Sequence, residues 1–134
     1  MQQPEGYEIG QGKVCKLKRS LYGLKQAPRC WNHRFITYIK KLGLEESKAD
    51  PCLFVRETKD EKLLLAVYVD DGLLAASKES TFRDCLEGLK LQFKITSKDA
   101  TYFLGIEIKQ GERGIRISQA SQARKILEKF NCRL

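Results

Sequence analysis

The sequence predicts an α+β domain built on an antiparallel sheet, and three observations lead to this fold class. Apolar residues recur at spacings of three and four within residues 27–42, 80–89 and 118–130, a pattern typical of amphipathic helices. Shorter apolar runs lie between these segments and are interrupted by polar turns, as in hairpins. The resulting order of helix, strand, hairpin, helix, hairpin and helix favours helices packed on one face of the sheet.

The N-terminal segment shows neither the helical spacing of apolar residues nor the apolar runs of strands. Residues 1–12 contain three glycines and one proline, so we expect a loop or a disordered start. Residues 14–17 are expected to form a short strand, and Tyr22-Gly23 a turn. The domain itself is expected to span residues 13–117, followed by a C-terminal segment at 118–134 that begins the last helix.

The first helix is expected over residues 27–42. Pro28 suits the first turn of a helix, where its missing N–H is not needed, and Gly43 supplies a stop at the other end. Trp31 begins the apolar stripe and is expected to fill the core. The members of that stripe are Trp31, Phe35, Tyr38, Ile39 and Leu42.

The middle of the chain predicts strands joined by tight turns. Residues 52–56 form a short strand candidate, and residues 63–69 form a second one with apolar residues on both faces, so both faces are expected to be covered. Asp70-Asp71-Gly72 interrupts the apolar run before it resumes at residues 73–76, which predicts a hairpin.

Similar patterns continue to the C-terminus. Ser80 is expected to cap the second helix, because serine side chains accept a hydrogen bond from the first turn. Residues 102–108 and 115–117 flank a turn at 111–114, which predicts a second hairpin before the last helix.

Charge is distributed unevenly along the chain. The 134 residues carry 25 Lys and Arg against 17 Asp and Glu, a formal net charge of +8. Basic residues predominate in residues 1–40 and 81–134, whereas acidic residues predominate in residues 41–80. This balance favours a polyanionic partner, with nucleic acid first and an anionic membrane surface as the alternative.

Other classes are disfavoured by the sequence. The longest apolar run, residues 63–68, is far shorter than the roughly 20 residues of a membrane span. The five cysteines are irregularly spaced and are expected to be reduced thiols, and His33 lies beside no cysteine pair, so a structural zinc site is not expected.

The adjacent carboxylates of Asp70 and Asp71 are the most informative pair. Like charges at a hairpin tip disfavour each other's ionisation unless a cation lies beside them, and Mg²⁺ binds through one or two carboxylates plus substrate phosphates. The alternative interpretation is plain hairpin chemistry, in which Asp71-Gly72 forms the turn and Asp70 is solvated.

Four motifs in order resemble the reverse transcriptase of copia-type LTR retrotransposons, from about Lys13 to Cys132. They are Leu21-Tyr22-Gly23-Leu24-Lys25-Gln26-Ala27-Pro28-Arg29-Cys30-Trp31, Tyr68-Val69-Asp70-Asp71, Phe103-Leu104-Gly105-Ile106 and Ile117-Ser118-Gln119. The resemblance implies a polymerase palm, an RNA-directed DNA polymerase activity of a Pol polyprotein, and a last helix that leads toward the thumb.

The resemblance also implies roles for individual residues. It implies that Asp70 and Asp71 are catalytic and bind Mg²⁺, with Mn²⁺ as an alternative. The other implied contacts are nucleotide or template binding by Lys25, Gln26, Pro28, Arg29 and Tyr68, and a primer grip at Phe103, Leu104 and Gly105. The implied partners are an RNA or DNA template with primer and deoxynucleoside triphosphates, without a membrane. The implied location is intracellular, in cytoplasmic virus-like particles or in the nucleus.

The sequence departs from the family pattern in its carboxylates. The family has three catalytic carboxylates, the first on a strand that precedes the Leu-Tyr-Gly motif, yet no aspartate precedes Asp50. We therefore expect a partial palm that lacks its first catalytic strand and the fingers, with weak or no activity alone. Gly72 is a milder departure, since an apolar residue is common there. The alternatives are a non-enzymatic basic nucleic-acid-binding remnant and a poorly folded fragment.

Overall fold

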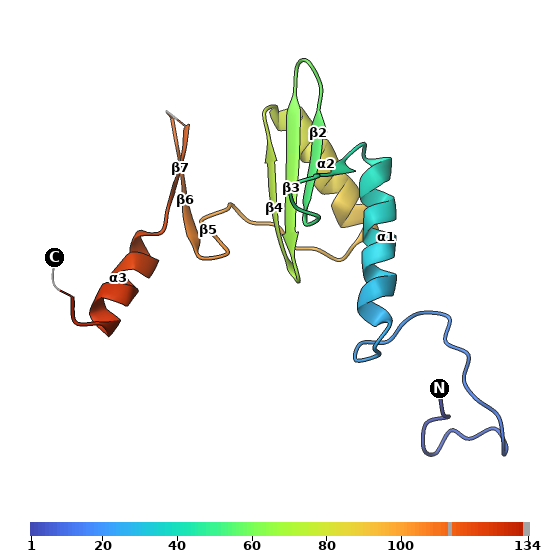
Figure 1. The fold of residues 1–134 in the computed structure, drawn as a ribbon. Coiled ribbons are helices and arrows are strands. Elements are labelled where there is room, and N and C mark those ends of the chain that lie inside the picture. The colour runs from blue at the N-terminus through green and yellow to red at the C-terminus, as the bar shows by residue number, and fades with distance from the viewer. Residues whose placement is uncertain (113, 133–134) are drawn as a thin grey trace. The chain divides into compact units, whose positions relative to one another are not determined.

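The structure is a computed structural model that describes residues 1–112 and 114–132 (Figure 1). The chain divides into two compact units, Met1–Lys41 and Leu42–Leu134, which are described separately. Within the described residues there are three helices and two antiparallel sheets, which confirms the α+β class. The strands were expected to form one sheet. They form two because the pairing of β1 to β4 does not continue into the strands that follow α2.

The first unit consists of a loop followed by helix α1 (Ala27–Lys41). Met1 and Cys15 exchange two backbone hydrogen bonds of 2.9 Å, and the Gln3 side chain donates to the carbonyls of Gly10 and Lys13. The strand expected at residues 14–17 is wrong, because this segment, exposed except at Cys15, pairs with no strand of the described chain.

Helix α1 follows its apolar periodicity. Pro28 is its second residue, and Phe35 and Ile39 are buried. Trp31 is 47% exposed and stacks on Phe35, with ring centroids 5.0 Å apart and planes 10° apart. The expectation that Trp31 fills the core is wrong, because it lies one turn beyond the buried part of the stripe.

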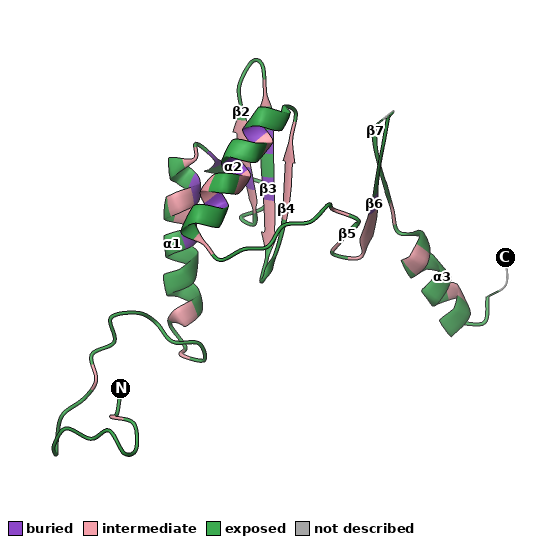
Figure 2. Ribbon diagram, turned by 180° about the vertical axis from the view of Figure 1, so that it is seen from behind, coloured by how far each residue is buried: buried purple, intermediate pink, exposed green. Residues whose placement is uncertain are grey.

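The second unit begins with a four-stranded antiparallel sheet in the order β1-β2-β3-β4. Its strands are β1 (Glu45–Glu46), β2 (Leu53–Glu57), β3 (Lys62–Tyr68) and β4 (Asp71–Ala76). Helix α2 (Glu79–Gln92) follows β4 and lies against the sheet (Figure 2). The buried apolar residues are Phe54, Leu63 and Leu65 of the sheet and Cys85 and Leu89 of α2.

Burial alternates along β3. Leu63 and Leu65 are buried, whereas Leu64 and Tyr68 point to the opposite face and are exposed. The expectation that both faces are covered is therefore wrong, because α2 covers one face only.

The start of α2 also differs from its prediction. Lys78 is the N-cap, no side chain caps the helix, and Ser80 lies within its first turn. A polar network stands near this end instead. The Thr81 hydroxyl donates to Glu61 (2.5 Å), and the Arg56 guanidinium pairs with Glu61 (3.4 Å) and donates to the carbonyl of Leu42 (2.7 Å).

The second sheet has the order β5-β6-β7, with β5 (Tyr102–Phe103), β6 (Ile106–Gly111) and β7 (Gly114–Ser118). The single strand expected at residues 102–108 is thus divided by a turn. Helix α3 (Ala120–Lys129) follows and has no buried residue. The Glu107 carboxylate accepts a hydrogen bond from the Ser121 N–H in its first turn (3.0 Å). No helix in the described part of the chain is long and apolar enough to cross a bilayer.

Candidate active site

The hairpin of β3 and β4 carries the two adjacent aspartates. Tyr68 pairs with Asp71, so the turn consists of Val69 and Asp70 only. Asp71 and Gly72 are the first residues of β4, and the turn lies two residues earlier than the Asp-Gly chemistry predicts. The register of the apolar pairs, such as Leu65 with Leu74, sets this position.

The turn is strained at Val69. Its φ is +53°, a left-handed conformation that costs a β-branched residue about 1–3 kcal/mol and is ordinarily given to glycine in two-residue hairpins. Such strain persists where the surrounding structure fixes it, and it clusters at functional sites. The six register pairs between β3 and β4 hold this turn in place.

The hairpin leaves both carboxylates open to solvent. Asp71 faces the same side of the sheet as its partner Tyr68, which is 56% exposed, and this side is the one that α2 does not cover. Neither aspartate forms an ion pair with a described residue. Two adjacent carboxylates without a protein cation can accept a divalent metal ion.

The donor set at the hairpin suits a hard cation. Mg²⁺ prefers oxygen ligands and needs only one or two carboxylates when waters and phosphates supply the rest. Among the described residues, no three His, Cys, Asp or Glu side chains form a group that could hold a metal ion. Asp70 and Asp71 could therefore supply two carboxylate ligands and no more from this group of side chains.

Four of the five residues predicted to bind nucleotide or template lie in the first unit, and the fifth, Tyr68, lies in the second. Lys25 and Gln26 precede α1, and Pro28 and Arg29 are in its first turn; all four are exposed. The Cys30 N–H donates to the Gln26 carbonyl (3.1 Å), so Gln26 is fixed at the helix start. Asp70, Asp71 and Tyr68 belong to the second unit.

The predicted primer grip forms the turn between β5 and β6. Phe103 pairs with Ile106, and Leu104 and Gly105 make a two-residue turn with φ values of +47° and +84°. A Cβ at Gly105 would meet no atom within 4 Å, so its positive φ, and not close packing, accounts for glycine here.

Nearly the whole chain matches one known protein family. A family described as "Reverse transcriptase (RNA-dependent DNA polymerase)" matches residues 1–133. The chain belongs to this reverse transcriptase family. The match confirms the resemblance seen in the four motifs.

The chain is similar to several curated transposon proteins. The chain is 34% identical to the retrovirus-related Pol polyprotein from transposon RE2 of Arabidopsis thaliana and 35% identical to that from transposon TNT 1-94 of Nicotiana tabacum. Each match covers 98% of this chain, but only 9% and 10% of the relatives. The putative transposon Ty5-1 protein of Saccharomyces cerevisiae is 34% identical over 85% of the chain and 38% of its own length.

The chain therefore spans about a tenth of the plant Pol polyproteins that it matches. No solved structure matches the chain with significance.

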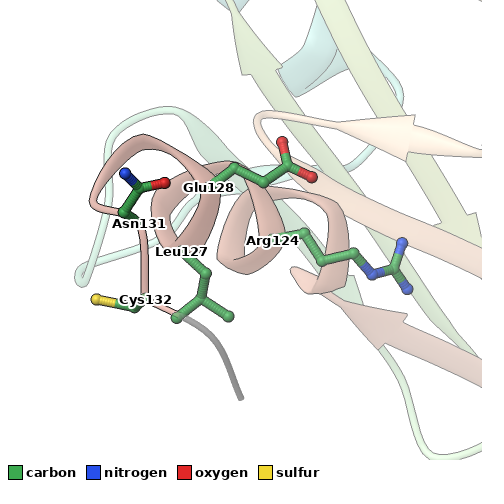
Figure 3. Close-up of a pocket in the computed structure, with 5 residues that line it drawn as sticks. All are labelled: Arg124, Leu127, Glu128, Asn131 and Cys132. Atoms are coloured by element: carbon green, nitrogen blue, oxygen red, sulfur yellow. The ribbon is translucent and has the colours of Figure 1, made fainter.

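The chain also has a hollow of about 270 Å³ at the end of α3 (Figure 3). It is lined by Arg124, Leu127, Glu128, Asn131 and Cys132. The side chain of Asn131 lies apart from those of Arg124 and Glu128, so the three do not converge on a common ligand (Figure 3). None of the residues that the motifs single out lies there.

Two features of the first unit were missed by the sequence reasoning. Tyr22 was taken only as a turn residue, and its side chain is fully exposed. Trp31 was taken as core and is half-exposed. Their position among basic residues was the available signal, because exposed aromatics with basic neighbours are typical of nucleic-acid-binding surfaces.

Proposed function

We propose that the chain is the catalytic hairpin region of a retrotransposon RNA-directed DNA polymerase. The observation that carries this proposal is the β3–β4 hairpin, which presents Asp70 in its turn and Asp71 beside Tyr68 on the uncovered face. Membership of the reverse transcriptase family and the Pol polyprotein relatives support it. The reaction is attack of a primer 3′ hydroxyl on the α-phosphate of a deoxynucleoside triphosphate, with release of pyrophosphate.

Asp70 would hold a divalent metal ion, and Asp71 would support it. When bound, Mg²⁺ or Mn²⁺ neutralises phosphate charge and favours the ionised 3′ oxygen. Tyr68 shares a face with Asp71, so in this proposal its ring lies beside the primer end. The register of β3 against β4 fixes the Val69–Asp70 turn, so the backbone of Asp70 and Asp71 would need little reorganisation when a metal ion binds.

The remaining motif residues would hold the substrates. Lys25 and Arg29 carry positive charge at the start of α1, where the free N–H groups of a helix also favour phosphate, and Gln26 and Pro28 shape this contact. The β5–β6 turn, with Phe103, Leu104 and Gly105, would hold the primer strand. The site would act in cytoplasmic particles or in the nucleus.

We also propose that the 134 residues alone extend a primer weakly or not at all. The family pattern uses three carboxylates, and the described residues bring two to the hairpin. Metal-assisted phosphoryl transfer depends almost entirely on positioning and charge neutralisation, so an incomplete ligand set weakens it strongly.

Primer extension with Mg²⁺ or Mn²⁺ tests the proposal, using this chain and the longest reading frame that contains it. In the longer protein, Asp70→Asn should reduce incorporation by about 100-fold or more. Asp60→Asn, at an exposed aspartate between β2 and β3, is the matched control and should leave incorporation unchanged. Equal incorporation by wild type and Asp70→Asn would reject the assignment.

A second candidate is a nucleic-acid-binding protein without catalysis. Residues 9–44 contain nine Lys and Arg and no Asp or Glu, which favours this candidate. It predicts binding that weakens steeply with salt and does not depend on sequence. Binding of that kind, without incorporation by the longest reading frame, would favour this candidate over the polymerase.

A further inference from the structure

The loop that joins β1 to β2, residues 47–52, lies at the same end of the sheet as the aspartate turn. Every neighbouring pair in the order β1-β2-β3-β4 is antiparallel, so this loop and the β3–β4 turn share one end, and the β2–β3 turn lies at the other (Figure 1). The register pairs Leu53 with Ala66, which places Cys52 beside Val67. The loop therefore meets the hairpin two residues before Val69.

Asp50 closes the end of this loop with two hydrogen bonds. Its carboxylate accepts from the Cys52 N–H (2.7 Å), and its carbonyl accepts from the Leu53 N–H (3.1 Å). Pro51 is the second residue of the four-residue turn so formed, and aspartate followed by proline is favoured at these two positions. The Ser47 N–H donates to the Leu53 carbonyl (2.8 Å) and closes the loop as a whole. The backbone of residues 50–53 is thus fixed within the loop itself.

The Cys52 carbonyl joins this turn to the aspartate hairpin, because it accepts a hydrogen bond from the Val67 N–H (2.9 Å). In a hydrogen-bonded pair of an antiparallel ladder, the two residues exchange both N–H···O bonds. Here the Cys52 N–H donates to Asp50 instead, so the ladder between β2 and β3 ends at this pair. Residues 68–70 therefore extend beyond β2.

The hairpin needs support near its turn. The left-handed Val69, with a φ of +53°, persists only where the surrounding structure holds it. Strand β4 is at the edge of the sheet, so neighbouring strands support the hairpin only from the β2 side. Among the described residues, the bond from Val67 to Cys52 is the contact with β2 that lies nearest to the strained turn.

We propose that Asp50 is a positioning residue for the aspartate hairpin. Its carboxylate holds the turn of residues 50–53, this turn directs the Cys52 carbonyl at Val67, and Val67 fixes the end of β3 from which Asp70 and Asp71 follow. Asp50 is no metal ligand in this proposal, since no three His, Cys, Asp or Glu side chains of the described residues form a group that could hold a metal ion. The effect on catalysis rests on the proposed function, whereas the link from Asp50 to Val67 does not.

Hydrogen exchange at the Val67 amide, measured by NMR on this chain, tests the link without metal or nucleotide. In Asp50→Ala the amide should exchange about tenfold faster than in wild type, because the turn loses a hydrogen bond to a charged acceptor. Asp50→Asn keeps an acceptor oxygen that closes the same turn and should restore slow exchange. Asp60→Ala, at an exposed aspartate in the β2–β3 turn, is the matched control and should exchange as wild type.

Two results of this experiment would overturn the proposal. One is wild-type exchange at Val67 in Asp50→Ala. The other is equal acceleration at Val67 and at Leu63, which lies at the opposite end of β3, because the substitution would then have lowered the stability of the whole sheet.

Primer extension by the longest reading frame tests the consequence for catalysis. Asp50→Ala should lower kcat by about tenfold and leave the KM for the deoxynucleoside triphosphate unchanged, because a small displacement of reacting groups slows the reaction more than it weakens binding. Asp50→Asn should restore kcat. Wild-type kcat in Asp50→Ala would overturn the positioning role, and an equal loss in Asp50→Asn would show that Asp50 acts through its charge and not through the turn.

Failure of this inference is distinguishable from failure of the proposed function. Faster Val67 exchange in Asp50→Ala, together with equal incorporation by wild type and Asp70→Asn, would support the link and reject the catalytic hairpin. Wild-type Val67 exchange in Asp50→Ala, together with loss of incorporation in Asp70→Asn, would reject the link and support the catalytic hairpin.

Discussion

The sheet covered by α2 and the segment from β5 to α3 bury very different amounts of apolar surface. In the first region Leu63 is 0% exposed, and Phe54 and Leu65 are also buried. Among the described residues of the second region, only Ile108 is buried, and Ile117 is 67% exposed. Helix α3 has ten residues, shorter than the roughly 12–15 that an isolated helix needs for marginal stability. The first region is thus held by a core, and the second by ladder hydrogen bonds and one carboxylate contact.

The largest expected effect concerns the core of the first region. Leu63→Ala should lower the free energy of unfolding by about 2–5 kcal/mol, because it leaves a cavity under α2. Ile117→Ala, on β7, should change it by less than about 0.5 kcal/mol, because the side chain is already exposed. Urea denaturation measures both. Similar losses in the two variants would mean that β7 is covered in solution.

The two hairpin turns should respond in opposite directions to substitution. Gly105→Ala should destabilise by about 1–2 kcal/mol, because alanine is strained at the positive φ of this turn. Val69→Gly should stabilise by about 1 kcal/mol, because it relieves strain in the β3–β4 turn. Thermal unfolding checks both signs. Destabilisation by Val69→Gly would show that the valine side chain makes a contact that outweighs its strain.

The smallest effects are electrostatic and depend on pH. A hydrogen bond from Thr81 has the largest effect on the pKa of Glu61 and lowers it. Burial opposes this effect, and the charges of Arg56 and Lys78 lower the pKa further. A pKa that is lowered in the folded state stabilises the protein at pH values above the ordinary pKa of 4.5. This stabilisation is lost as the pH falls through the lowered pKa. The urea concentration at half-unfolding should therefore fall less on acidification in Glu61→Gln than in the wild type. Glu87→Gln, at an exposed glutamate of α2, should leave that fall unchanged.

The corresponding effect in the second region is local to α3. Hydrogen bonds from Ser121 lower the pKa of Glu107. The ionised carboxylate should therefore stabilise the start of α3 at pH values above its ordinary pKa of 4.5. This stabilisation should be lost as the pH falls through the lowered pKa. Hydrogen exchange at the Ser121 amide should accelerate in Glu107→Gln, while the exchange of β3 amides stays unchanged. Loss of β3 protection in this variant would mean that the two regions unfold together.

The sequence predicted the elements whose local and tertiary signals agree. Helix α1 was expected at residues 27–42 and occurs at Ala27–Lys41, because its apolar periodicity and Pro28 both favour it. The aspartate hairpin was expected from the interrupted apolar run and occurs between β3 and β4. The family was also predictable, since its motifs lie in order along nearly the whole chain.

Other features depend on contacts that one sequence does not reveal. The left-handed Val69 is set by the register of β3 against β4, although the Asp-Gly dipeptide two residues later favours a different turn. The Leu104–Gly105 turn was hidden in an apolar run, because leucine rarely adopts positive φ. The coverage of β3 on one face depends on where α2 packs, which periodicity does not specify. The roles of the site residues remain predictions.

The alkylation rate of Cys85 reports how often α2 separates from the sheet. Cys85 lies on the buried face of α2, and burial raises the pKa of its thiol, whereas none of the other four cysteines is buried. An alkylating reagent will therefore consume the four outer thiols first and reach Cys85 only when α2 lifts from the sheet. The delay before the fifth alkylation would give the opening rate of this core in the unmodified protein.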